Sequence, residues 1–196
     1  MQQQPKDTAS SGLTYKLAKF VEGEWIPHSH PAIFTIKTTS AQTRRLVAGV
    51  PGGEVMVLSK LTECLFAPFH ILYVLHTPRG EGVAGRYQSP LVQDSELSDF
   101  LSRYSAFLKG DARFDLWIHS PGSNGTLVWD RHNLLYAYGP VECFTKALHG
   151  LGFSNGEPNI PAPHQHFYRE ECDVDAFNIL SAFSWRYSPL HPEDEQ

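Results

Sequence analysis

The stretch Phe114-Asp-Leu-Trp-Ile-His119 is followed by Pro121-Gly-Ser-Asn-Gly125 and then by Thr126-Leu-Val-Trp-Asp130. A second short segment, Arg131-His132-Asn133, leads to Leu134-Leu-Tyr-Ala-Tyr138. Short apolar runs that are rich in aromatic residues and separated by Gly, Pro, Asn and Asp are typical of strands joined by tight turns. Connections this short exclude parallel pairing, which needs a crossover of about a dozen residues. The stretch therefore predicts a three-stranded antiparallel meander.

The rest of the chain surrounds this meander with further strands and helices. Strands outnumber helices in the first half and helices follow later, which is not the regular alternation of a doubly wound sheet. We expect an α+β protein with a mainly antiparallel sheet, made of the meander and N-terminal strands and covered by about three to four helices. Strands are predicted over residues 13–20, 33–37, 54–61, 69–76, 85–89 and 164–169, and helices over residues 40–47, 94–110, 140–152 and 173–185.

Length and composition predict one domain over residues 13–189, between a disordered polar tail at 1–12 and an acidic tail at 190–196. The chain has 196 residues, of which 41% are hydrophobic, and this is enough to bury a full core. The N-terminus lacks the apolar segment of a signal peptide, and no apolar run is long enough for a membrane helix. The net charge of -5, with scattered Lys and Arg, argues against nucleic-acid binding. We therefore expect a cytoplasmic protein that binds neither nucleic acid nor membrane.

The cysteine pattern points to the same compartment. The three cysteines, Cys64, Cys143 and Cys172, are odd in number and far apart in the sequence. A secreted disulfide framework would use an even set at close spacing. Reduced thiols are therefore expected.

The pair His164-Gln165-His166 is the sharpest candidate for metal chemistry. In a strand, a period of two places both imidazoles on one face. Zinc accepts His nitrogen and carboxylate oxygen ligands. Alternatively, both side chains bind only backbone groups or water, and the chain needs no cofactor. The candidates for a third ligand are His119, Asp130, His132 and Glu170.

A second candidate site is built on Cys143, in the first turn of the helix after the meander. Aligned backbone dipoles at a helix start favour a thiolate. His164 or His166 would then act as the base and Asp173 would orient it, an order that resembles papain-like hydrolases. The alternative is that Cys143 is a small buried hydrophobic residue.

The turn at Asp130-Arg131-His132-Asn133 is the third candidate. Asp and Asn are favoured in turns for purely structural reasons, but Arg131 and His132 would project from a rigid hairpin tip. Trp129 and Tyr136 flank the turn, and an exposed Trp/Tyr face would suit a protein interface. The alternative is that the N-terminal strands cover this face.

These observations favour a non-enzymatic protein-binding module, immunity-like or adaptor-like, that acts through the aromatic meander and its turn at 130–133. Its partner would be another protein. Many bacterial accessory and immunity proteins share this composition, which is an analogy at the level of fold class alone. The alternative is a small hydrolase centred on His164 and His166, either zinc-dependent with Asp130 or His132, or cysteine-dependent with Cys143.

Overall fold

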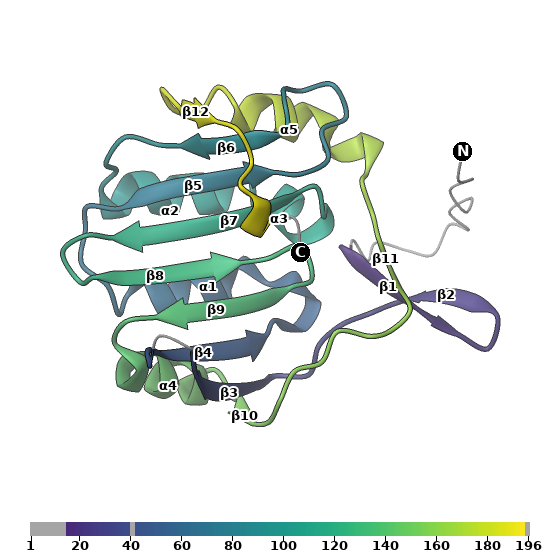
Figure 1. Ribbon diagram of the computed structural model, residues 1–196, viewed down its shortest axis with the longest axis horizontal. Coiled ribbons are helices and arrows are strands. Elements are labelled where there is room, and N and C mark those ends of the chain that lie inside the picture. Colours follow the sequence, from purple (N-terminus) through teal and green to yellow (C-terminus); the bar gives the residue numbers. More distant parts are fainter. Residues whose placement is uncertain (1–14, 40–41, 195–196) are drawn as a thin grey trace.

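The computed structural model describes residues 15–39 and 42–194, and their strands form one large and one small sheet. The predicted tail at 1–12 lies outside the described residues. The large sheet has nine strands in the order β10-β3-β4-β9-β8-β7-β5-β6-β12 (Figure 1). All pairs in it are antiparallel except β10 with β3, so the sheet is mixed. Its strands are β3 (Ile33–Thr38), β4 (Arg44–Gly49), β5 (His70–Leu75), β6 (Gly85–Gln88), β7 (Phe114–Ser120), β8 (Gly125–Trp129), β9 (Leu134–Tyr138), β10 (Ser154–Asn155) and β12 (Arg186–Ser188).

The helices gather on one side of the large sheet. Figure 1 shows α1 to α4 behind the sheet, with α5 near β6 and β12. Their apolar faces pack against one face of the sheet and form the core with it. In the described part of the chain, none of the helices has the length and apolar character needed to cross a bilayer. The helices are α1 (Val55–Thr62), α2 (Asp94–Arg103), α3 (Ser105–Gly110), α4 (Val141–Gly150) and α5 (Asp173–Ile179).

The predicted fold class is confirmed at the level of a mainly antiparallel α+β protein. The predicted sheet was too small, because the meander is the centre of a nine-stranded mixed sheet. Five α-helices, rather than three to four, lie within the described residues. Two further elements were predicted with the wrong type, and each error has a physical cause.

Residues 54–61 form helix α1 rather than the predicted strand. Alternating Val55 and Val57 resemble a strand pattern, but the buried side chains are Val57, Leu58 and Leu61. This spacing is that of one face of a helix. The packing of that face against the sheet outweighs the strand preference of the two valines.

Residues 44–49 form strand β4, where the sequence predicted a helix from Ser40 to Val47. The strand pairs on both sides, with β3 and with β9, and Arg45 lies opposite Tyr138. Residues Leu46 to Gly49 are buried. The pairing partner in β9 lies about ninety residues further along the chain, so no local pattern indicates it.

The meander itself is β7, β8 and β9, as predicted. Burial alternates along β7, where Phe114, Leu116 and Ile118 are buried against the helices. The intervening side chains, including Asp115 and Trp117, therefore project from the opposite face. That face carries no α-helix in the described residues, and it forms the floor of the candidate site.

The small sheet pairs an N-terminal hairpin with a strand from the C-terminal part of the chain. Its strands are β1 (Leu17–Val21), β2 (Glu24–Pro27) and β11 (His164–His166), in the order β11-β1-β2. The sequence predicted β11 as part of a longer strand, but not its partner. The partner is β1, and Leu17 lies opposite His166. Figure 1 shows this sheet beside one end of the large sheet.

The cysteines differ from the expectation of reduced thiols. Cys64 and Cys143 form a disulfide across 79 positions of sequence. It joins the loop after α1 to the first turn of α4. Cys172 is a free, buried cysteine.

Candidate metal centre

A cleft of about 1170 Å³ lies on the face of the large sheet opposite the α-helices. Its floor consists of outward-facing side chains from four neighbouring strands, β4, β9, β8 and β7. The C-terminal segment borders it, where Asp194 approaches Arg86 at 3.8 Å. The floor residues are Arg45, Asp115, Trp117, Thr126, Val128, Tyr136 and Tyr138, and His132, Ile160, His164 and His166 lie along the wall.

His132 reaches the cleft from the turn between β8 and β9. One carboxylate oxygen of Asp130 accepts hydrogen bonds from the backbone N–H groups of His132 (2.9 Å) and Leu134 (2.8 Å). Asn133 has φ of 59°, a left-handed conformation that asparagine tolerates well. Asp130 and Asn133, which the sequence suggests as ordinary turn residues, therefore hold His132 in a fixed position.

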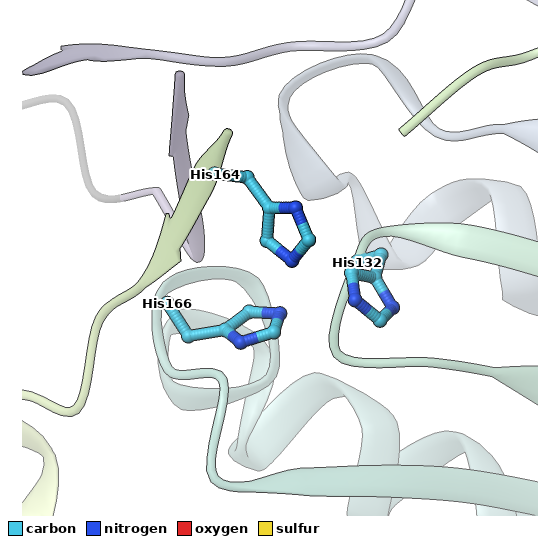
Figure 2. A group of neighbouring side chains, drawn as sticks. All are labelled: His132, His164 and His166. Carbon is cyan, nitrogen blue, oxygen red and sulfur yellow. The ribbon is translucent and has the colours of Figure 1, made fainter. Parts of the chain in front are cut away.

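His164 and His166 reach the same point from β11 in the small sheet. Both side chains lie on one face of the strand, as the period of two predicts. The three imidazoles of His132, His164 and His166 point toward one another (Figure 2). The ring centroid of His132 lies 5.2 Å from that of His164 and 4.7 Å from that of His166. One nitrogen from each ring lies within 4.8 Å of the other two.

Hydrogen bonds hold two of these rings through their Nδ1 atoms. His132 donates from Nδ1 to Asp130 at 3.2 Å, and His164 donates from Nδ1 to the carbonyl of Pro161 at 2.9 Å. In the neutral form of both rings, Nε2 is then the nitrogen that can accept a bond. Nε2 of His166 is buried and has no hydrogen-bond partner among the described residues. A buried nitrogen without a partner is costly unless a ligand satisfies it.

Two more histidines support the backbone behind His132. His30 is buried and donates from Nε2 to the carbonyl of His132 at 2.8 Å. Nε2 of His28 lies 3.4 Å from Nδ1 of His30. Burial lowers the pKa of His28 to about 4 and also lowers that of His30. Both rings are therefore neutral near pH 7.

The electrostatics around the cluster keep His166 neutral as well. Burial, together with the nearby His132 and Arg131, lowers the pKa of His166 to about 3. A neutral imidazole is the form that binds a metal. In a tetrahedral zinc site with bonds of about 2.0–2.1 Å, ligand nitrogens are roughly 3.3 Å apart, so modest ring rotations would complete the three-histidine set.

The other predicted metal ligands lie elsewhere. Asp130 contacts His132 rather than the point where the three rings converge. Nδ1 of His119 lies 2.9 Å from the hydroxyl of Thr126 on the neighbouring strand. Glu170 begins a 3-10 helix after β11 and is exposed.

The residues of the predicted cysteine site are not brought together. The sulfur of Cys143 is bonded to Cys64 and is not a thiol. The carboxylate of Asp173 contacts Arg113 at 2.9 Å and Arg79 at 3.1 Å. It therefore belongs to an ion-pair network on the helix side of the sheet, and no nucleophile–base pair forms around Cys143.

The predicted binding residues divide between the two faces of the meander. Arg131, His132 and Tyr136 line the cleft. Trp129 is fully buried and packs beneath the amine of Lys16, which lies 4.2 Å from the centroid of its ring. Its side chain is therefore not available on the surface.

Sequence reasoning missed Arg45 and Trp117, which lie on the cleft floor. The alternation of β7 was a usable signal for Trp117, because it places Trp117 on the same face as Asp115. No such signal existed for Arg45, since its segment was predicted as a helix. No protein-family model matches the chain, and neither a curated protein nor a solved structure matches it significantly.

Proposed function

We propose that the chain is a small metal-dependent hydrolase that binds one zinc-like divalent ion through His132, His164 and His166. The observation that carries this proposal is the convergence of three imidazole nitrogens within 4.8 Å of one another. Two of the rings are oriented by hydrogen bonds to Asp130 and Pro161. Metal-binding histidines are usually held in this way through their second nitrogen.

The donor set favours zinc over the harder cations. Calcium and magnesium take oxygen ligands, whereas imidazole nitrogens suit zinc and its neighbours in the first transition row. Structural zinc sites usually have four protein ligands, and catalytic sites have three with one position left for water or substrate. The described residues offer three ligands at this point, beside an open cleft. This combination favours a catalytic over a structural role.

In the proposed site, the metal would supply the reactive water, and Asp130 and Asp115 would hold His132 in place. A bound zinc ion supplies a water of lowered pKa and polarises the bond to be cleaved. Asp130 fixes the tautomer and the orientation of the His132 ring. Asp115 accepts a hydrogen bond from the backbone N–H of Arg131 at 2.8 Å and pairs with His76 at 3.0 Å. It thereby holds Arg131, the residue directly before His132 in the turn.

Metal analysis of the full chain tests the proposal. We expect one zinc per chain in the purified protein, and in chelated protein titrated again with zinc. His132→Ala, His164→Ala and His166→Ala should each lower zinc affinity at least tenfold. His119→Ala is the matched control, because His119 lies on the same sheet face outside the cluster. Zinc binding well below one per chain, or binding that all three variants retain, would refute the metal site.

Catalysis needs its own measurement. Release of 4-nitrophenol from 4-nitrophenyl acetate and from bis(4-nitrophenyl) phosphate should follow zinc content and be lost on chelation. Stoichiometric zinc without either activity would contradict the hydrolase function and leave a metal-binding protein.

The non-enzymatic protein-binding module stays a prediction beside this proposal. Arg131 and His132 do lie at the wall of the cleft, where a partner's side chain or segment would enter. Trp129 is unavailable and Tyr136 lies on the cleft floor, so a concave site that receives a small group fits better than a flat aromatic interface. A chain that binds no zinc would favour this alternative.

A further inference from the structure

We propose that Arg45 binds an oxyanion, a carboxylate or a phosphate, on the substrate whose hydrolysis the three-histidine site would catalyse. This inference rests on the proposed function, because it names the class of substrate that the same cleft accepts. The guanidinium of Arg45 on the cleft floor would bind the anionic group of the substrate. The hydrolysable bond of the substrate would lie near His132, His164 and His166.

Arg45 lines the cleft and has no acidic partner among the described residues. It is half-buried, and it forms no ion pair within the described residues. Two other arginines differ: Arg44, next to it on β4, pairs with Glu142 at 2.7 Å, and Arg86, on the distant strand β6, approaches Asp194 at 3.8 Å. A partly buried cation without a counter-charge destabilises a fold. Such exceptions are expected where a ligand supplies the missing charge.

The contacts of Arg45 hold its side chain without neutralising it. A terminal nitrogen donates to the hydroxyl of Tyr138 at 3.3 Å, and the guanidinium lies 5.4 Å from the ring centroid of Tyr136. Nε is buried and has no hydrogen-bond partner among the described residues. Arginine presents a planar set of donors that matches carboxylate and phosphate oxygens in pairs. The contact with the ring of Tyr136 helps to hold this set of donors in the cleft.

One tyrosine connects the two ends of the proposed site. The hydroxyl of Tyr136 donates to Asp130 at 3.4 Å, and Asp130 accepts from His132 at 3.2 Å. Arg45 and the histidine cluster are therefore connected through the ring of Tyr136 and the carboxylate of Asp130, and all of these residues line the cleft. A substrate that spans this ring would place its anion on Arg45 and its hydrolysable bond at the histidines.

Four of the five acidic residues that line the cleft, all but Glu193, have a basic or imidazole partner. Asp115 pairs with His76, and Asp130 with His132. Glu142 pairs with Arg44 at the rim. Bound zinc would add further positive charge at the far end of the cleft.

Titration calorimetry on zinc-loaded full chain tests the proposal, with inorganic phosphate and acetate as separate probes at constant ionic strength. We expect at least one of them to bind, and their relative affinities distinguish a phosphate from a carboxylate substrate. Arg45→Met should weaken that binding at least tenfold. Arg45→Lys should recover part of it, because an ammonium keeps the charge without the paired donors. Arg103→Met is the control, since it removes an exposed arginine from α2 on the opposite side of the sheet.

Zinc content measured on the same samples separates the two proposals. Normal zinc content in Arg45→Met, together with lost anion binding, supports both. If the zinc-loaded protein binds neither phosphate nor acetate, or if Arg45→Met binds them equally well, the proposed role of Arg45 is wrong. The proposed metal site is unaffected by that result. Absence of zinc from the wild-type chain overturns the hydrolase, and loss of anion binding in Arg45→Met then still supports the anion site.

Discussion

His132 donates a hydrogen bond from Nδ1 to the carboxylate of Asp130 at 3.2 Å, two residues earlier in the same turn. The same carboxylate also organises the turn through the backbone N–H groups of His132 and Leu134. One side chain thus sets both the position of His132 and the nitrogen that it presents to His164 and His166. Asp130 therefore stabilises the turn and also orients a ring of the candidate metal site.

Asp130→Asn should weaken zinc binding by about 10-fold to 100-fold, because an amide keeps the turn hydrogen bonds but loses the charge that supports His132. Competition titration with a chelating dye measures the change. Asp99→Asn, an exposed substitution on α2, serves as the control. Unchanged zinc affinity in Asp130→Asn would show that the carboxylate has no electrostatic role at the site.

Gly49→Ala should disturb the support behind His132. A Cβ at position 49 would lie 2.6 Å from Cβ of His30, and His30 holds the carbonyl of His132. We expect the free energy of unfolding to fall by about 1–3 kcal/mol, and zinc affinity to fall with it. Gly150→Ala is the matched control, because no atom lies within 4 Å of its added Cβ. Equal stability of the two variants in urea would contradict this account.

Lys16→Met should stabilise the fold at neutral pH. Burial lowers the pKa of Lys16 from 10.5 to about 8, and its amine has no hydrogen-bond partner among the described residues. The charged amine therefore costs the folded state most below pH 8, and this cost disappears as pH rises toward 10.5. We expect a gain of up to ~3 kcal/mol at pH 7. Contacts of the amine with the rings of Phe114 and Trp129 would reduce this gain.

Urea denaturation across pH measures the effect of Lys16→Met. The difference from wild type should shrink between pH 8 and 10.5, where the wild-type amine loses its proton in the folded state. Lys146→Met, at an exposed position of α4, should show no such trend. A constant difference across this range would mean that packing, and not charge, decides the result.

Replacing Cys64 and Cys143 together by alanine should destabilise the chain by ~4 kcal/mol, since the disulfide closes a long loop in the unfolded state. Urea denaturation in the absence of reductant measures the loss, and Cys172→Ala is the control. Addition of reductant should destabilise wild type and leave the double variant unchanged. Equal stability of wild type and the double variant would indicate that the two sulfurs are not bonded in solution.

The parts of this fold that the sequence predicts correctly are local. The meander is one continuous stretch with turn residues between its strands, and the pair His164 and His166 follows from the period of a strand. The pairing of β4 with β9 and of β1 with β11 joins residues far apart in the chain, and no local pattern carries it. Arg45 was missed for this reason, and His132 remained one of four candidates for the third ligand. The disulfide was missed because an odd number of cysteines fits either reduced thiols or one pair and a remainder.

The pairing of β1 with β11 also has a consequence for biosynthesis. Leu17 is synthesised well before its partner His166, which lies 149 positions later in the chain. Contacts of such long sequence separation form late and slowly in folding. The nascent chain would therefore complete the candidate metal site only after most strands of the large sheet have been synthesised, and truncated products ending before β11 would lack two of the three histidines.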